Sequence, residues 1–135
     1  MTDQPEPIRR WHKIVHARNF DALDSWLADD AVFVSPAVHT PQTGRTLVKK
    51  YLVAAAHVLM NESFHYVGEW FGERSAVLEF EATLDGLFIN GVDIIHWDEH
   101  GRVLRFKVIV RPLKALQTVV PLMASRLAAN SGTQP

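Results

Sequence analysis

The sequence contains no cysteine, which excludes both disulfide bonds and metal sites built from thiolates. It also lacks an excess of charge of either sign, because 14 basic and 15 acidic side chains leave a formal net charge of −1 at pH 7. Such a balance gives no electrostatic footprint for nucleic acid or for an anionic membrane. We therefore expect neither nucleic acid nor membrane among its partners.

Long apolar runs are missing as well. No segment approaches the ~20 apolar residues of a membrane-spanning helix. The start, MTDQPEPIRR, has no apolar run behind a positive end, as a signal peptide would have. A glycine-rich phosphate loop is also absent. We expect a cytoplasmic protein with no cofactor and no metal site.

What remains is a chain of ordinary composition, with 135 residues of which 47% are hydrophobic and 21% charged. This length and apolar content predict one globular domain with a core of its own. We place the domain at residues 8–129 and predict disordered tails at 1–7 and 130–135, which are short and polar.

The hydrophobic pattern has a helical period at both ends of the chain and a period of two between them. Predicted helices begin at Pro7, span Phe20–Leu27 and Thr46–Met60, and follow Pro112, where Pro121 should kink or interrupt the last helix. Predicted strands span Ala31–Ser35, Phe64–Phe71, Ser75–Leu84, Leu87–Trp97 and Val103–Val110. This order predicts an α+β fold, with a curved antiparallel β-sheet wrapped around the N-terminal helices to form a cone with an apolar pocket.

Asp93 stands inside an apolar strand segment, VDII, where a carboxyl group must be paired, protonated or exposed to water. In one register with the next strand it lies opposite Phe106, on the apolar face. A shift by one residue places it opposite Lys107 on the wet face, because a slip of one exchanges the two faces. The pattern alone leaves both open: an exposed Asp93–Lys107 pair, or a carboxyl inside the cone whose pKa burial would raise.

The segment VDIIHWDEHGRV resembles the corresponding hairpin of bacterial ketosteroid isomerases, members of the nuclear-transport-factor-like, SnoaL-like superfamily. RRWHKIVHARNFDALDSWLADDAVFVSP is similar to that family's opening, two helices that lead through ADDA into the first strand and a proline. The helix after Gly44 fits too, so the resemblance covers residues 8–111. It implies the cone fold with a pocket for a small apolar ligand.

The resemblance also implies roles for single residues. The isomerases use a carboxylate base, a tyrosine, and an aspartic acid that an apolar site keeps neutral as a hydrogen-bond donor. Asp93 matches the aspartic acid, which favours the pocket-facing register. Ser35 stands at the position of the base, Trp11 at that of the tyrosine, and Leu52, with Tyr51 beside it, at that of a further tyrosine. One of the three functional groups matches, so the resemblance does not carry the isomerase mechanism over to this chain.

The candidate catalytic residues are Asp93, Ser35 and His39. His39 follows Ser35 in the same loop and is either a base, since histidine titrates near neutral pH, or an exposed loop residue. His12 and His16 have the i, i+4 spacing of a chelating pair but no third ligand, so we interpret them as surface residues.

The expected ligand-binding residues come from the first helix, the central helix and the last strand. The last strand's alternation predicts that Leu104, Phe106, Val108 and Val110 are buried. The residues expected to bind the ligand are Trp11, Tyr51, Phe106, Val108 and Val110.

Two functions follow from these expectations. The first is a small enzyme, an isomerase, cyclase or hydrolase, that acts with Asp93 as pocket acid on a small apolar oxygenated substrate such as a steroid-, terpenoid- or polyketide-like compound. The second is a non-catalytic ligand-binding or dimeric structural module of the same fold. Glu79 and Glu81 share the outward sheet face, which faces solvent or a dimer interface, and by analogy we expect a homodimer through that face.

Overall fold

Helices and strands follow one another in the order that the hydrophobic periods predict. The computed structural model describes residues 3–130; residues 1–2 and 131–135, which include most of the predicted C-terminal tail, lie outside the described part. The helices are α1 (Glu6–Ala17), the 3-10 turn η1 (Phe20–Ala22), α2 (Leu23–Trp26), α3 (Arg45–Leu59) and α4 (Leu113–Asn130). The strands are β1 (Leu27–Val34), β2 (Gln42–Thr43), β3 (His65–Phe71), β4 (Ser75–Leu84), β5 (Leu87–Trp97) and β6 (Val103–Arg111).

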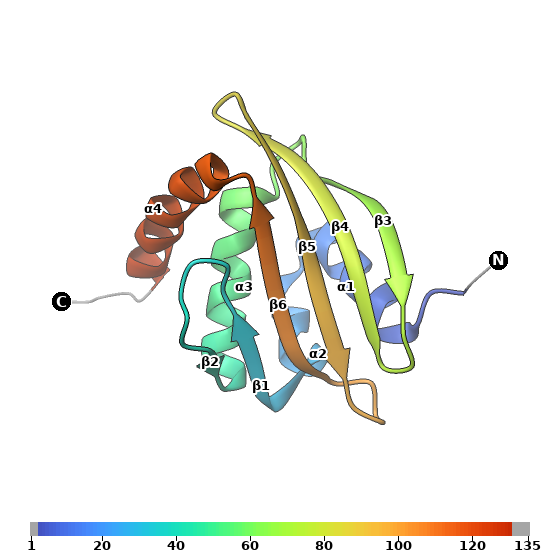
Figure 1. Cartoon of the computed structure of the whole chain (residues 1–135). Helices are drawn as coiled ribbons and strands as arrows, with labels where there is room; N and C mark the ends of the chain where they lie inside the picture. The colour runs from blue at the N-terminus through green and yellow to red at the C-terminus, as the bar shows by residue number, and fades with distance from the viewer. Residues whose placement is uncertain (1–2, 131–135) are drawn as a thin grey trace.

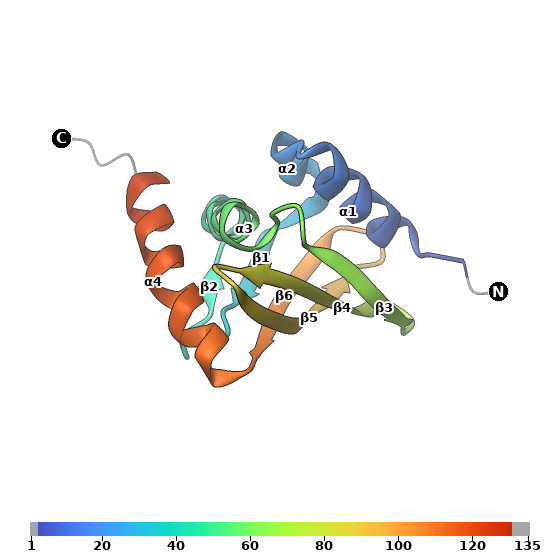
Figure 2. The same cartoon turned by 90° about the horizontal axis from the view of Figure 1, so that it is seen from above.

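The six strands form one curved sheet in the order β2-β1-β6-β5-β4-β3. All neighbours are antiparallel except β1 and β6, which run parallel. Helices α1, α2 and α3 cover the concave face, and α4 lies beside α3 at the end where β1 and β2 form the edge (Figures 1 and 2). The α+β class and the largely antiparallel curved sheet are therefore as predicted.

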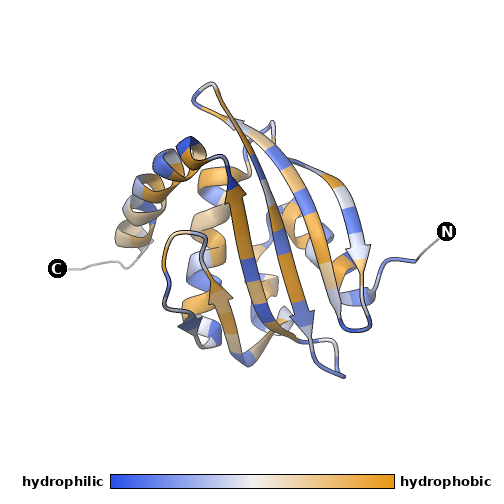
Figure 3. Cartoon of the chain, viewed as in Figure 1, coloured by the Kyte–Doolittle hydropathy of each residue, from blue (hydrophilic) through white to orange (hydrophobic). Residues whose placement is uncertain are grey.

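The alternating pattern of the strands determines which side chains enter the core. In β4, Ala76, Leu78 and Phe80 are almost completely buried, and the residues between them face outward. Figure 3 shows hydrophobic and hydrophilic segments alternating along the strands. The Asp85–Gly86 turn that joins β4 to β5 has φ angles of 52° and 79°, and Asp-Gly is a pair that favours such tight hairpin turns with positive φ.

Three irregularities interrupt the strand pairing: one lies in β1 between Leu27 and Val32, and those in β3 and β6 shape the interior. In β3 the pairing shifts between Tyr66 and Gly68, so that Val67 is an extra residue. In β6 Leu104 is the extra residue, because Trp97 pairs with Val103 but His96 pairs with Arg105. Leu104 is consequently exposed, and the prediction that it is buried is wrong.

The structure corrects two predicted helices. The predicted helix Phe20–Leu27 is a 3-10 turn followed by the single turn of α2, and Leu27 already begins β1. Helix α4 continues through Pro121, so the predicted interruption is absent, although proline removes one i→i−4 hydrogen bond there. Of the predicted tail 1–7, residues Glu6 and Pro7 belong to α1. Within residues 3–130, no helix is both long and apolar enough to cross a membrane.

Candidate functional site

Asp93 points from the middle of β5 into the interior of the cone. It is only 4% exposed. Among the residues that the structure describes, no other residue with a polar or charged side chain is buried to this degree. Its partner across the strands is Val108, whereas Ile94 pairs with Lys107. Both predicted partners, Phe106 and Lys107, are therefore wrong, because the turn holds five residues between Trp97 and Val103 and the extra residue Leu104 shifts the register by one more. The pocket-facing orientation that the resemblance favoured is the one observed.

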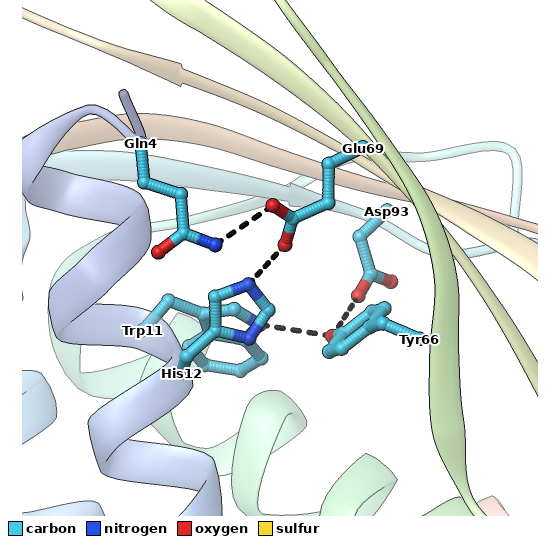
Figure 4. A network of polar contacts seen from close by, with 6 residues as sticks. All are labelled: Gln4, Trp11, His12, Tyr66, Glu69 and Asp93. Carbon is cyan, nitrogen blue, oxygen red and sulfur yellow. Dashed lines mark hydrogen bonds and ion pairs between the residues drawn. The ribbon is translucent and has the colours of Figure 1, made fainter. Parts of the chain in front are cut away.

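A chain of two directional hydrogen bonds ends on this carboxyl group (Figure 4). The hydroxyl group of Tyr66 on β3 donates to Asp93 Oδ2 at 2.6 Å. The indole Nε1–H of Trp11 on α1 donates to the same hydroxyl oxygen at 2.9 Å. Because an indole can only donate, the hydroxyl proton of Tyr66 is directed at Asp93.

Burial raises the pKa of Asp93 to about 7, because an ionised carboxylate loses its hydration inside the cone, and the hydrogen bond from Tyr66 lowers the pKa against this effect. Burial also raises the pKa of Tyr66 well above its ordinary value, and the neighbouring Asp93 raises it further. Tyr66 is therefore a neutral donor. Asp93 changes its charge near neutral pH.

The second carboxyl oxygen of Asp93 is the free one. Within the described residues, Oδ1 has no hydrogen-bond partner. It is also not fully enclosed by protein atoms, so a ligand atom can reach it. Asp93 borders a small inner cavity of about 20 Å³. Its lining is otherwise apolar and aromatic: Trp11, Leu52, Ala55, Leu59, Met60, Phe64, Phe80, Phe106 and Val108. This cavity is large enough for one water-sized group.

A larger outer cavity of about 130 Å³ lies next to the inner one and shares Ala55, Leu59 and Val108 with it. Its lining includes residues of the loop after β1, of α3, of β6 and of α4. The α4 residues in the wall are Val119, Val120, Met123, Ala124 and Leu127. Together the two cavities form an apolar space, and Asp93 is the single carboxyl group among the described residues that line it.

The predicted ligand-binding residues all line this space. Trp11 and Phe106 border the inner cavity, Tyr51 and Val110 border the outer cavity, and Val108 borders both. Tyr51 also packs on Phe33, with the ring centroids 5.5 Å apart.

The predicted catalytic residues are not brought together. Ser35 lines the outer cavity, whereas Asp93 lines the inner one, and the Ser35 hydroxyl oxygen accepts a hydrogen bond from the Ala37 amide at 3.1 Å. His39 is exposed and lines neither cavity. The structure therefore gives no support to His39 as a base for Asp93.

The sequence analysis did not identify Tyr66 or the polar cluster beside it, which Glu69 forms with Gln4 and His12. Glu69 on β3 accepts a hydrogen bond from Gln4 at 2.7 Å and pairs with His12 Nε2. His12 lies edge-on to the Tyr66 ring, with centroids 5.2 Å apart, so it is half-buried and not the surface residue predicted. A signal for Tyr66 was present, since Phe64 and Tyr66 share one face of a predicted strand and a buried tyrosine needs a hydrogen-bond partner.

Metal ligands do not cluster in this site. Within residues 3–130 there is no group of three or more histidine, aspartate or glutamate side chains placed to hold a metal ion. The chemistry available at the inner cavity is that of one titratable carboxyl group and its fixed tyrosine.

A curved sheet around three helices, with an acid at the end of an apolar space, defines a class of small-molecule pocket folds. The model of the SnoaL-like domain matches residues 8–106. The chain belongs to the SnoaL-like domain family. A comparison with curated proteins finds no match.

Solved structures agree with this assignment. A steroid delta-isomerase from Pseudomonas aeruginosa is 34% identical, with a TM-score of 0.88 over 94% of this chain and 93% of that chain. A protein with a cystatin-like fold from Silicibacter pomeroyi is 27% identical, with a TM-score of 0.79 over 96% and 87%. A protein with a ketosteroid isomerase-like fold from Catenulispora acidiphila, in complex with trimethylamine, shares the fold at 14% identity and a TM-score of 0.64 over 87% and 93%.

Proposed function

We propose that this protein binds a small, largely apolar, oxygenated molecule in the two adjoining cavities, and that Asp93 acts as an acid–base group on the ligand's oxygen. The observation that carries the proposal is the free Oδ1 of a buried carboxyl group at the inner end of an apolar cavity. Apolar walls with one convergent polar group are the usual composition of a small-molecule site.

The titration of Asp93 suits acid–base chemistry. With a pKa of about 7, both forms of the carboxyl group are populated near neutral pH, which is where a general acid or base is most effective. The neutral form donates a hydrogen bond from Oδ1 to a carbonyl or epoxide oxygen, and the ionised form accepts a proton from the ligand. Isomerisation, cyclisation and hydrolysis all contain such a step. The steroid delta-isomerase among the similar structures supports the first of these.

A second candidate function is binding without turnover. Asp93 is the single carboxyl group among the described residues that line the two cavities, and no histidine lines either of them. Because Ser35 stands where the isomerases have their base, the site has an acid but no second group to complete a proton transfer. In this case Asp93 only orients the ligand.

The experiment that tests the proposal is a turnover screen of cyclic enones and epoxides with the wild type and with Asp93→Ala. We expect a substrate whose conversion is lost in Asp93→Ala, because removing the carboxyl group removes the acid. Asp30→Asn, on the exposed part of β1 and outside both cavities, is the matched control and is expected to retain turnover. Conversion that survives in Asp93→Ala would contradict the role of Asp93. Ligand binding without conversion would leave the second candidate.

We also propose that the chain forms a homodimer through the outer face of the sheet. The outward side chains of β6 include Arg105 and Lys107, those of β4 include Glu79 and Glu81, and apolar β5 side chains lie between them. A two-fold axis over β5 would place the basic strand of each protomer on the acidic strand of its partner, as an isologous interface requires.

The dimer is tested by sedimentation velocity. We expect the wild type to sediment with twice the mass of the chain, and Ile109→Glu to sediment as a monomer, because Ile109 is 51% exposed on this face and a charge there would be buried without a partner. His16→Glu on α1, away from the outer sheet face, serves as the control and should remain dimeric. A monomeric wild type would contradict the proposal.

A further inference from the structure

The two adjoining cavities differ in size and in the groups that they offer to a ligand. The outer cavity is apolar and measures about 130 Å³, whereas the inner cavity measures about 20 Å³ and contains the carboxyl group. An apolar cavity of ~150 Å³ takes a molecule the size of benzene. Sites for larger ligands usually measure ~300–1,000 Å³. The available space therefore corresponds to one ring, with room for one further atom beside Asp93.

The inner cavity is better suited to a ligand oxygen than to a resident water. A buried water needs two to four polar partners. Among the described residues that border the inner cavity, Asp93 offers a free polar atom, while the indole N–H of Trp11 is already bonded to Tyr66. A carbonyl oxygen that is attached to a ring in the outer cavity needs only the one hydrogen bond from Asp93.

Three side chains line both cavities, and they differ in their freedom to move. Ala55 and Leu59 are one turn apart on α3, and Val108 faces them from β6. Alanine has no side-chain rotamers, and the branched valine is stiff at χ1. Leu59 ends α3 and is the side chain of the three that can change rotamer and open a passage.

We propose that Leu59 is a specificity-determining gate that limits the ligand to a one-ring ketone, with the ring in the outer cavity and the carbonyl oxygen past Leu59 at Asp93. Fused polycyclic ketones are excluded because the outer cavity of about 130 Å³ leaves no room for a second ring while Leu59 stands beside it. This inference rests on the proposed binding function and names its ligand class.

The test uses 2-cyclohexenone, a fused two-ring enone and a four-ring steroid enone as probes, with the carboxyl-carbon NMR signal of Asp93 as the readout. In the wild type we expect 2-cyclohexenone to perturb this signal and the steroid to leave it unchanged. In Leu59→Ala the passage is permanently open, so we expect the two-ring enone to bind about tenfold more tightly than to the wild type, which is an easily measured change. Cyclohexane, which lacks the oxygen, should leave the Asp93 signal of the wild type unchanged.

Two further variants keep the test independent of folding. Leu59→Phe fills the passage, so 2-cyclohexenone should no longer perturb Asp93 in this variant. Leu23→Ala, a leucine truncation at a buried site that lines neither cavity, should leave the size selectivity of the wild type unchanged.

The outcomes separate the gate from the proposed function. If no probe perturbs Asp93 in any variant, the proposed function fails, and the gate fails with it. If the steroid perturbs the wild type as strongly as 2-cyclohexenone does, or if substitutions of Leu59 leave size selectivity unchanged, the gate is overturned while the proposed function stands.

Discussion

Asp93→Asn is expected to be more stable than the wild type at alkaline pH. The Asp93 carboxyl group is protonated in the folded state up to about pH 7 but ionises near 3.8 in the unfolded chain. The folded state thus binds more protons than the unfolded state between these values, so the wild type loses stability as the pH rises. The difference between the two pKa values corresponds to roughly 4 kcal/mol, of which roughly 3 kcal/mol falls between about pH 5 and about pH 9. Asparagine has nearly the same shape but no charge, so its variant escapes this loss.

Urea unfolding at a series of pH values measures this effect. The free-energy difference between Asp93→Asn and the wild type should grow in favour of the variant as the pH rises. Asp30→Asn, on the exposed part of β1, is the matched control and should run parallel to the wild type. Parallel curves for Asp93→Asn as well would mean that the pKa of this carboxyl group is not raised by burial.

Tyr66→Phe is expected to raise the pKa of Asp93 above about 7, because the variant loses the hydrogen bond that stabilises the carboxylate. A hydrogen bond to a charged group contributes roughly 1.5–3 kcal/mol, which corresponds to about one to two pH units. The variant also leaves the Trp11 N–H without its acceptor, which costs about 1–3 kcal/mol of stability.

Carboxyl-carbon NMR titration measures this pKa, with Asp93→Asn to assign the signal. The chain has two tyrosines, and the second provides the control. Tyr51→Phe alters the outer cavity only, so the pKa of Asp93 should stay where it is in the wild type. An unchanged pKa in Tyr66→Phe would show that the tyrosine does not donate to Asp93.

Most of the fold was predictable because its elements carry strong local signals. The alternation of period two predicted both end residues of β4 and of β5 correctly, and the turn between them falls at an Asp-Gly pair, which favours tight hairpin turns. Shorter elements were missed where local preference yields to tertiary packing. The two-residue strand β2 is too short to show a period and forms only by pairing with β1. The early start of β1 at Leu27 depends on pairing with the distant strand β6, which no local pattern encodes.

The site was predictable only in part, for a specific physical reason. Glu69 stands three residues after Tyr66, so strict alternation would place the two on opposite faces. The extra residue Val67 cancels this, and both pair with inward-facing residues of β4, Phe80 and Leu78. In β6 the extra residue Leu104 likewise shifts the pairing, so that Asp93 lies opposite Val108. An alternating sequence pattern does not show where a strand contains an extra residue, and after that residue the inward and outward positions are exchanged.

The division of the cavity walls has a consequence for how ligand range can change. Helix α4 contributes five residues to the outer cavity and none to the inner one. The family model ends at residue 106, before α4 begins at Leu113. The part of the outer cavity wall that α4 supplies is thus encoded in a separate stretch of the gene from Trp11, Tyr66 and Asp93. Mutations confined to residues 113–130 would change which ring substituents the outer cavity accepts. The hydrogen-bonded residues Trp11, Tyr66 and Asp93 would stay unchanged.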